Sequence, residues 1–476
     1  MEFILMCLLA VFIGTVLART ACFNPKPQPK TTNEEITFDR DAAVDALAQL
    51  IRCKTISYYD HSLEDDAEFE KLIVLLPKLY PHVFETCEFQ QLPDRALLFR
   101  WPGKHPGSPT VLMAHYDVVP VNEENWDKPP FAGIIENGVL WGRGTLDTKA
   151  TINGVLFSAN HLIGEGYQPE HDIYFAFSGG EEVNGNGAPN IVQYFVDHNI
   201  DPAIVVDEGG AVVEGVFPGV KQPCAVIGIA EKGMMNVQYR TVSAGGHASA
   251  PKAHTPVGVL AAACKKVENH PFPMHLTKPA AEMFDTLGRH STLLYKVVFA
   301  NLWCFGWILD LLGKKSGGEI NALLRTTSAF TQMEGSTAPN VIPPEARMVA
   351  NMRLNPSDSV SSVLEYLKKT VHDPAVEITA VGAFEPSRIS RTDCEAWKML
   401  SATVAETWPG VIVTPYLMVA CSDSRHWGRI SDKVYRFCPM EMSNEERAAI
   451  HGNNERIRLK CICDCVEFYI RLMKKC

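Results

Sequence analysis

The sequence has few of the features that mark a disulfide-stabilised or thiolate-metal protein. Only 14 of its 476 residues are cysteine, and no two of them form a Cys-x-x-Cys pair, so we expect no thiolate zinc site. A chain of this length buries a sufficient core without disulfide bonds. Asn-x-Ser/Thr glycosylation acceptors are absent, except for one at Asn355 that Pro356 blocks. Any inference about secretion therefore rests on the N-terminus.

Positive charge is also in deficit. Lys and Arg number 44 against 55 Asp and Glu, which gives a formal net charge of −11. This balance excludes a general nucleic-acid or anionic-membrane binder, because such proteins need a positive surface. The apolar fraction of 46% and the charged fraction of 21% are those of a globular protein, so disorder is excluded as well. The length predicts two or three domains.

Long apolar runs are scarce, and the longest one opens the chain. Residues 3–18 are about as long as the core of a signal peptide and short for a membrane span, which needs about 20 residues. We expect a signal peptide over residues 1–18, with an uncleaved signal anchor as the alternative, followed by a Pro-rich linker over 19–36. The protein is then secreted, or lumenal if the anchor holds it.

Short apolar runs and helical stretches alternate in the first half of the chain. Strands are predicted over 111–114, 173–177 and 204–206, with a helix over 148–163 between the first two. This alternation indicates an α/β domain whose sheet is mostly parallel.

The pattern then changes to a β-α-β-β-α-β order, which is the ferredoxin-like unit. Its predicted elements are the strand 235–242, the helix 256–267, the strands 326–332 and 347–354, the helix 361–371 and the strand 376–381. Because α/β patterning resumes at 394–407 and 412–419, the unit is inserted into the first domain. The predicted boundaries are 37–230 and 384–476 for the α/β domain and 231–383 for the insertion.

Acidic residues and one histidine follow the predicted parallel strands. His115 and Asp117 follow the first strand, Glu181 and Glu182 the second, and Asp207 the third. Ligands of α/β sheets gather at the carboxyl ends of the strands, so these side chains should meet. Crowded carboxylates repel one another unless a cation neutralises them, and mixed imidazole and carboxylate ligands suit zinc or a similar divalent ion. The candidates outnumber what one catalytic zinc needs, which favours two metals.

These motifs resemble those of the M20 peptidase family of co-catalytic zinc amidohydrolases. The stretches that carry the resemblance are His115-Tyr116-Asp117-Val118-Val119-Pro120, Gly142-Arg143-Gly144-Thr145-Leu146-Asp147, Gly180-Glu181-Glu182, Val206-Asp207-Glu208-Gly209-Gly210, Gly246-His247-Ala248-Ser249 and His451-Gly452-Asn453-Asn454-Glu455. The resemblance as a whole extends from about residue 37 to the C-terminus. One departure is Thr148, where many members have a second acid.

The resemblance implies a two-zinc site with one bridging water or hydroxide. His115 and Asp207 would bind one zinc, Glu182 and His451 the other, and Asp147 would bridge both. This division of ligands comes from the family. Sequence order does not provide it.

The resemblance also gives roles to the remaining polar residues of the motifs. Asp117 would orient His115, and Glu181 would be the general base. His247 would stabilise the oxyanion, often from a partner subunit, or else be an ordinary loop histidine. Asn340 and Arg353 would bind the substrate carboxylate, with a surface salt bridge as the alternative for Arg353.

A second apolar segment, residues 297–309, lies inside the inserted region. It is too short to span a bilayer. We expect either a buried helix or dimer contact, or a wall for a lipid acyl chain or a patch that touches a membrane or lipid particle.

The function implied by the resemblance is reversible, zinc-dependent cleavage of the amide bond of N-acyl amino acids, with a fatty acyl group favoured. The alternative is a metallocarboxypeptidase or dipeptidase of the carboxypeptidase S type. A non-catalytic lipid or metal carrier is a third hypothesis from another class, but all five ligands and the base Glu181 are present. We expect a small-molecule substrate, no nucleic acid, and a homodimer formed through the inserted domain.

Overall fold

The strands predicted in the first half form the centre of an eight-stranded mixed sheet. The computed structural model describes residues 1–29, 34–215, 217 and 219–476. The strands lie in the order β1 (Glu88–Leu92), β2 (Ala96–Trp101), β6 (Ile173–Ser178), β3 (Thr110–His115), β7 (Ile204–Val213), β16 (Val434–Met442), β8 (Cys224–Glu231) and β15 (Ile412–Met418). The pairs β6–β3, β3–β7, β7–β16 and β8–β15 are parallel, so the sheet is mostly parallel as predicted.

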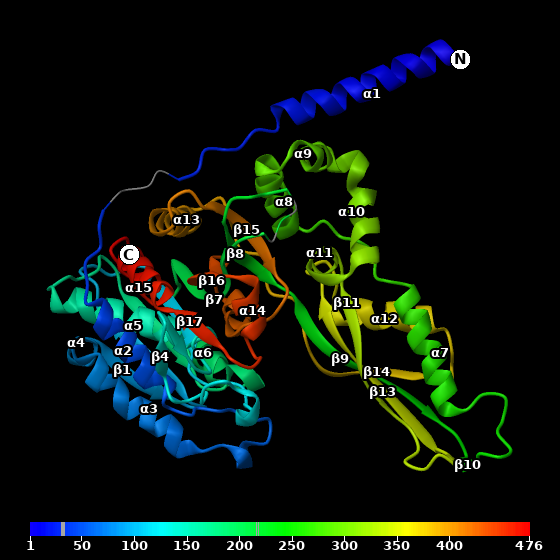
Figure 1. Ribbon diagram of the computed structural model, residues 1–476, viewed down its shortest axis with the longest axis horizontal. Helices are drawn as coiled ribbons and strands as arrows, with labels where there is room; N and C mark the ends of the chain where they lie inside the picture. The colour runs from blue at the N-terminus through cyan, green and yellow to red at the C-terminus, as the bar shows by residue number, and fades with distance from the viewer. Residues whose placement is uncertain (30–33, 216, 218) are drawn as a thin grey trace.

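Helices cover both faces of this sheet (Figure 1). Every residue of β3 and β6 is buried, as the uninterrupted apolar runs of a parallel sheet require. The helices of this domain are α2 (Arg40–Ile51), α3 (Asp66–Leu79), α4 (Pro81–Thr86), α5 (Lys149–Gly164), α6 (Gly187–Asp197), α13 (Glu395–Thr407), α14 (Asn444–Ala449) and α15 (Leu459–Met473). A small sheet of β17 (Arg456–Arg458), β5 (Val139–Trp141) and β4 (Ile134–Glu136) joins them at one edge.

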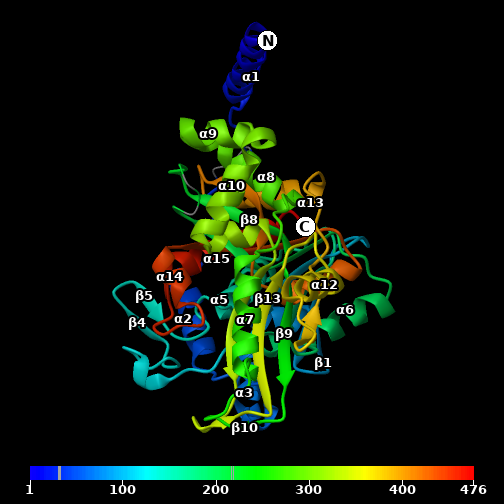
Figure 2. The same cartoon turned by 90° about the vertical axis from the view of Figure 1, so that its right-hand side faces the viewer.

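The inserted unit forms a separate antiparallel sheet, with its helices on one face (Figure 2). The order is β11 (Thr327–Glu334), β13 (Glu345–Leu354), β9 (Gly233–Val242) and β14 (Glu377–Phe384), covered by α7 (Pro256–Asn269) and α12 (Val360–Val371). Buried and half-buried residues alternate along β9, because one face of the sheet packs on the helices. The predicted β-α-β-β-α-β order is confirmed. We call this unit the lid.

The short strands β10 (Gly246–His247) and β12 (Val341–Ile342) pair at the end of the lid that lies farthest from the large sheet (Figure 1). We call this end the tip. The strands β9 and β13 each have ten residues, so at about 3.3 Å per residue the tip lies about 30 Å from the base of the lid.

Four helices lie between α7 and β11, where the sequence indicated a helix only as one alternative for residues 297–309. They are α8 (Lys278–His290), α9 (Leu293–Ala300), α10 (Leu302–Ser316) and α11 (Gly318–Leu324). The buried residues Met283, Phe284 and Leu287 of α8 belong to the same apolar cluster as Tyr416 of β15. These helices therefore belong to the lid in sequence, but pack on the sheet of the large domain.

The segment 297–309 is bent and mostly half-buried, with two exposed tryptophans. It runs from the end of α9 into α10, and the two helices meet at 113°. Trp303 is 58% exposed and Trp307 is 64% exposed, with Leu293, Leu294, Leu311 and Leu312 exposed nearby. The expectation of a buried helix is met only in part: Phe299, Ala300 and Leu309 belong to the same apolar cluster as α8, whereas the two tryptophans are exposed. The six exposed side chains form a patch that we call the α9–α10 patch.

The N-terminal helix α1 (Glu2–Cys22) is long and apolar enough to cross a membrane, and it extends beyond residue 18. Most of it projects away from the rest of the chain (Figure 1), but its last turns contact α9 and α10. Nε of Arg19 donates to the carbonyl of Ala300 at 3.1 Å, and Nδ2 of Asn301 donates to the carbonyl of Val16 at 3.3 Å. Part of the predicted linker, residues 30–33, lies outside the described residues.

Candidate metal centre and active site

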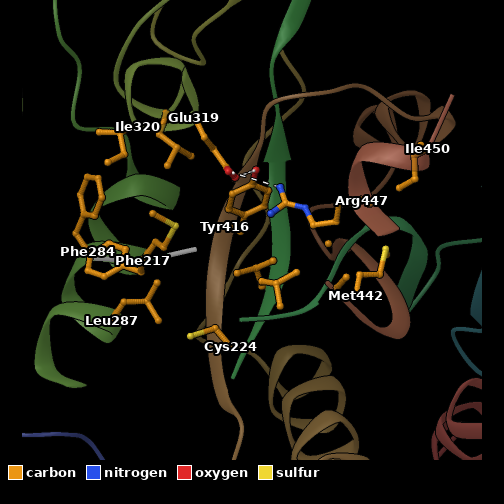
Figure 3. A pocket seen from close by; sticks show the side chains of 17 residues that line it. Phe217, Cys224, Phe284, Leu287, Glu319, Ile320, Tyr416, Met442, Arg447 and Ile450 are labelled. Carbon is orange, nitrogen blue, oxygen red and sulfur yellow. Dashed lines mark hydrogen bonds and ion pairs between the residues drawn. The ribbon is translucent and has the colours of Figure 1, made fainter. Parts of the chain in front are cut away.

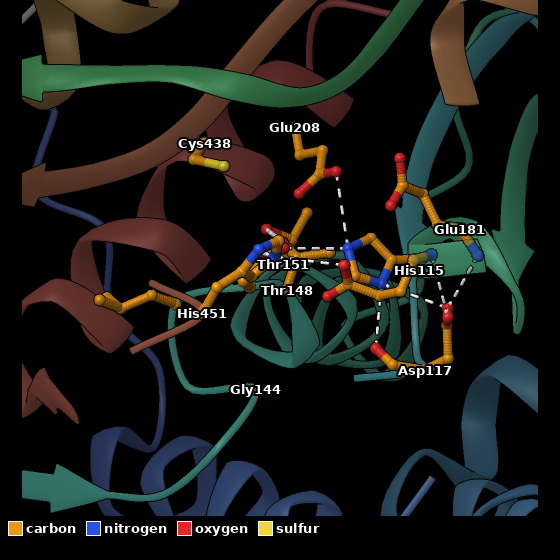
Figure 4. Close-up of polar contacts among 12 residues, drawn as sticks. His115, Asp117, Gly144, Thr148, Thr151, Glu181, Glu208, Cys438 and His451 are labelled. Atoms are coloured by element: carbon orange, nitrogen blue, oxygen red, sulfur yellow. Dashed lines mark hydrogen bonds and ion pairs between the residues drawn. The ribbon is translucent and has the colours of Figure 1, made fainter. Parts of the chain in front are cut away.

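The two oxygens of the Asp147 carboxylate face two different imidazoles, those of His115 and His451, which are labelled in Figure 4. Oδ1 lies 3.0 Å from Nε2 of His115, and Oδ2 lies 2.9 Å from Nε2 of His451. Nε2 of His451 also lies 3.1 Å from Oε2 of Glu182. His115 follows β3, Asp147 precedes α5, Glu182 follows β6 and His451 follows α14, so four separate elements bring these side chains together. This is the geometry of a carboxylate that bridges two positions.

The fifth predicted ligand, Asp207, does not face this cluster, and its neighbour does. Oε1 of Glu208 lies 3.5 Å from Nε2 of His115. Oδ2 of Asp207 instead accepts a hydrogen bond of 2.9 Å from the backbone N–H of Ser424. The sequence suggested that the third strand ends at Val206, but β7 continues to Val213. Successive side chains of a strand point to opposite faces, so only one of the two acids reaches His115.

Two glycines after Glu208 look like a turn in the sequence, but the structure gives them another role. A side chain at Gly210 would collide with the carbonyl of Val226 on β8, and Gly209 has a positive φ of 133°. The glycines therefore allow a close approach between strands and do not end β7. The geometry favours Glu208 in place of the predicted Asp207.

Asp117 orients both the imidazole and the following acidic turn, as expected for a residue behind the ligands. Oδ1 of Asp117 lies 3.3 Å from Nδ1 of His115. Its two oxygens also accept hydrogen bonds of 3.1 Å from the backbone N–H groups of Glu181 and Glu182. Oγ of Ser57 donates a further hydrogen bond of 2.6 Å. Asp117 is fully buried, so these contacts fix the position of His115 relative to the turn that carries Glu181 and Glu182.

Glu455 positions the loop that carries Asp147, and no role for it was predicted. Its carboxylate accepts hydrogen bonds from the backbone N–H groups of Gly144, Leu146 and Asp147 at 2.7–3.2 Å. Nη1 of Arg143 donates to the same carboxylate at 2.6 Å. Glu455 is the last residue of the motif that begins at His451, but its partners are more than 300 residues away in the sequence. Sequence spacing therefore gave no signal for this contact.

The electrostatics of the cluster favour a cation. Burial and the neighbouring carboxylates raise the pKa of Glu208 to about 8, and they raise the pKa of Glu181 well above its usual range. Burial lowers the pKa of His115, but the surrounding carboxylates outweigh this and raise it. Crowded acids in a low dielectric are unfavourable as anions, and a divalent ion removes that penalty.

The donor atoms fit such an ion. The ligand atoms of His115, Asp147 and Glu182 lie within 4.8 Å of one another, as do those of His115, Glu181 and Glu208. The set contains imidazole nitrogens and carboxylate oxygens, which suit zinc and similar divalent metals. The nearby thiol of Cys438 is buried and accepts a hydrogen bond from the N–H of Gly209, and its pKa is raised by burial. The residues present therefore fit the metals that the sequence predicted.

His247 and Asn340 lie together at the tip of the lid and away from the metal-site cluster. His247 pairs with Val341 across β10 and β12, and the N–H of Ala248 donates to the carbonyl of Asn340 at 3.0 Å. Nδ1 of His247 lies 2.7 Å from Oγ of Ser249, and the imidazole is exposed. The structure brings these two predicted residues together, but it does not bring them to the metal-site cluster of the same chain.

Arg353 lies at the opposite end of the lid, where it joins the large domain. It is near the end of β13, and its Nη1 donates to Sγ of Cys421 at 3.2 Å. Cys421 lies in the loop that continues to Ser424, the residue that contacts Asp207. Arg353 therefore lies at the junction of the lid with the large domain, next to the loop that contacts Asp207, and the surface salt bridge considered for it is not among its contacts in the described residues.

Comparison with known proteins identifies the family of the chain. The model of peptidase family M20/M25/M40 matches residues 111–475. The chain belongs to this family, and the fold and site define it as a metal-dependent hydrolase.

Among its relatives, the chain is 35% identical to "Probable carboxypeptidase S-like 2" of Dictyostelium discoideum, over 90% of this chain and 84% of that one. It is 34% identical to "N-fatty-acyl-amino acid synthase/hydrolase PM20D1" of Xenopus tropicalis, over 98% of this chain and 93% of that one. The fold is similar to that of an M20 family metallo-carboxypeptidase from Sulfolobus solfataricus, with a TM-score of 0.67 and 18% identity over 91% of this chain and 98% of that one.

Proposed function

We propose that the protein is a two-metal amidohydrolase that cleaves, and in reverse forms, the amide bond of N-fatty-acyl amino acids. The observation that carries the proposal is the Asp147 carboxylate, whose two oxygens face His115 and His451 at about 3 Å. A bridging carboxylate between two imidazole-containing sets is what a co-catalytic pair of metals requires.

In this proposal His115 and Glu208 would hold one divalent cation, Glu182 and His451 would hold the other, and Asp147 would be shared by both. Zinc fits the donor set. When bound, the two cations lower the pKa of an attacking water and polarise the carbonyl oxygen of the amide.

Glu181 is the proposed general base. It accepts a proton from the attacking water and donates it to the nitrogen of the leaving amine. Burial raises the pKa of Glu181 well above its usual range, which makes its carboxylate a stronger base. Asp117 holds the backbone of Glu181, so the carboxylate stays beside the ligands.

The substrate side of the proposal rests on Arg353 and on the relatives. A planar guanidinium binds a carboxylate with two parallel hydrogen bonds, so Arg353 is suited to the free carboxylate of an amino acid. The relative from Xenopus tropicalis is named for N-fatty-acyl amino acids. Fatty acid and free amino acid would be the products. Hydrolysis and synthesis share one transition state, so concentrations decide the direction.

The second candidate function is that of a metallocarboxypeptidase or dipeptidase of the carboxypeptidase S type. The relative from Dictyostelium discoideum, at 35% identity, favours it as strongly. Both functions use the same metals, the same base and a free substrate carboxylate. They differ in whether the group on the other side of the amide is a fatty chain or an amino acid.

A second copy of the chain would supply His247 to stabilise the oxyanion. The distance of about 30 Å between the base and the tip of the lid supports this, because it separates His247 from Arg353 of its own chain. Asn340 lies beside His247 and would reach the substrate carboxylate from the same copy.

The location proposed for the protein is extracellular, or lumenal with α1 as the anchor. The exposed Trp303 and Trp307 support contact of the α9–α10 patch with a membrane surface or lipid particle, because amphipathic indole rings favour that interface. The patch also lies beside α1, because the ring of Phe12 packs edge-on against Trp303.

A comparison of substrates tests the function. The purified, metal-loaded protein is assayed with oleoyl-phenylalanine and with Gly-Leu, in parallel with Glu181→Gln. We expect kcat/KM for the acyl substrate to exceed that for the peptide by at least about tenfold, and Glu181→Gln to lose about 10²–10⁴-fold while it retains metal. Faster cleavage of the peptide would support the carboxypeptidase. Bound metal without turnover of either substrate would support the carrier.

A further inference from the structure

An apolar cavity lies between the large sheet and the helices inserted into the lid (Figure 3). Its volume is about 120 Å³. Its floor is formed by β7, β8 and β15, through residues such as Ala211, Val226 and Tyr416, and its roof by α8 and α11, through Phe284 and Leu323.

The cavity begins beside the metal-site cluster. Two of its lining residues are Gly209, which follows Glu208, and Ile450, which precedes His451. The cavity therefore approaches the metal-site residues through β7 and α14. Arg353 contacts Cys421, and neither residue lines the cavity, so the site proposed for the substrate carboxylate is separate from the cavity.

The lining is apolar except at one side. There Oε1 of Glu319 accepts a hydrogen bond of 2.9 Å from the hydroxyl of Tyr416, and Oε2 lies 3.6 Å from Nη2 of Arg447. The side chains of Glu319 and Arg447 are 32% and 35% exposed, whereas Phe284 and Leu287 are almost fully buried. The ion pair links α11 to α14 and marks the side that opens to solvent.

We infer that this cavity binds the acyl chain of the substrate, an inference that rests on the proposed function. An apolar cavity of about 150 Å³ takes up benzene, so this one accommodates a chain segment of about six carbons. The remaining carbons of a longer chain leave past Glu319 and Arg447. Neither Trp303 nor Trp307 lines the cavity, so the wall for an acyl chain that was considered for residues 297–309 lies instead on α8 and α11.

The inference predicts a particular dependence on chain length. Each methylene group that enters the cavity increases kcat/KM by about fourfold, through burial of apolar surface. The increase continues from acetyl to about octanoyl and then stops, because further carbons lie in solvent. When the amino-acid part of the substrate is changed instead, kcat/KM should not depend on the size of the cavity.

The test varies the cavity and the substrate together. Ala211→Leu fills the cavity, Leu287→Ala widens it, and Leu260→Ala removes a buried leucine from the lid core as the matched control. Each metal-loaded full chain is assayed with acetyl-, butyryl-, octanoyl- and oleoyl-phenylalanine, and with octanoyl-glycine and octanoyl-leucine. Binding of a dansyl-labelled undecanoic acid is measured by fluorescence, independently of turnover.

We expect Ala211→Leu to lower kcat/KM at least tenfold for octanoyl and oleoyl substrates and less than twofold for acetyl, and to weaken binding of the labelled acid to the same degree. Leu287→Ala moves the plateau to longer chains, and Leu260→Ala changes no preference. Equal losses on acetyl and oleoyl substrates, a changed preference for the amino acid, or unchanged binding of the labelled acid would overturn the inference. If the wild type binds the labelled acid but cleaves no acyl amino acid, the proposed function fails and the cavity assignment stands.

Discussion

Arg143 donates a hydrogen bond of 2.6 Å to Glu455, and both side chains are almost completely buried. A buried ion pair of this kind is costly to break, because the remaining charge has no partner. Glu455 also holds the backbone N–H of Asp147, so the pair links protein stability to the position of the bridging carboxylate.

The first prediction concerns this pair. Glu455→Gln should lower the free energy of unfolding by about 3–5 kcal/mol, because Arg143 remains buried without its counter-charge. It should also weaken metal binding by about 10–100-fold, as expected when a group that orients a ligand is lost. Denaturant unfolding and metal titration measure the two effects. The control is Glu445→Gln, whose side chain is 79% exposed and should change neither.

The second prediction separates two neighbouring acids. Glu208→Ala should reduce the bound metal from two ions to about one per chain, because Glu208 faces His115. Asp207→Asn should retain both ions, because Asp207 contacts the backbone of Ser424. Elemental analysis of the two purified variants decides between them. Loss of metal from Asp207→Asn alone would restore the ligand set implied by the sequence.

The third prediction concerns metal removal. Chelation should lower the melting temperature, because the carboxylates around His115 repel one another without a cation. At a metal concentration 100 times the Kd, binding contributes about 2.7 kcal/mol, which corresponds to several degrees. The loss should be reversed by added zinc and should be smaller in His451→Ala. Equal melting temperatures with and without chelator would contradict a metal site at this cluster.

The fourth prediction concerns His247 and a second copy of the chain. Glu181→Gln and His247→Ala should each be nearly inactive, but their co-expressed mixture should recover up to about a quarter of wild-type activity, because half of the dimers contain one complete site. The control Lys252→Ala changes an exposed residue of the same loop and should remain active. If the mixture is as inactive as each single variant, His247 does not act at the active site of a second copy.

The fifth prediction concerns the α9–α10 patch. In a chain that begins at Arg19, replacing Trp303 and Trp307 by alanine should weaken binding to phosphatidylcholine vesicles by about tenfold, because indole rings anchor proteins at the interface. Co-sedimentation with vesicles measures this. Tyr59→Ala removes an aromatic ring that is 79% exposed at another place and should have no effect. Equal vesicle binding by the double tryptophan variant and by Tyr59→Ala would exclude the α9–α10 patch as the membrane contact.

Much of the site follows from local rules of sequence. His115, Glu181 and Glu182 were located because buried strands of a parallel sheet have recognisable lengths and their carboxyl ends meet at one edge. The β-α-β-β-α-β order of the lid was readable for a similar reason, since each element shows its own periodicity.

Other parts depend on contacts between distant segments. The choice between Asp207 and Glu208 depends on whether β7 ends at Val206, and the glycines that suggested an end are there because β8 passes close to Gly210. The pairing of Glu455 with the loop at Asp147 joins residues about 310 apart. The helices α8 to α11 pack on a domain other than the one that contains them in sequence, so no local pattern indicated the cavity beneath them.

The length of the lid has a mechanical consequence. The lid joins the large domain near Gly233 and Phe384, and its tip lies about 30 Å from this junction. A small rotation at the junction therefore becomes a large displacement at the tip. A rotation of about 10° at this junction moves His247 by about 5 Å, which is enough to make or break a hydrogen bond. Residues that only set the angle of the junction would thus control the turnover of an active site that they never touch.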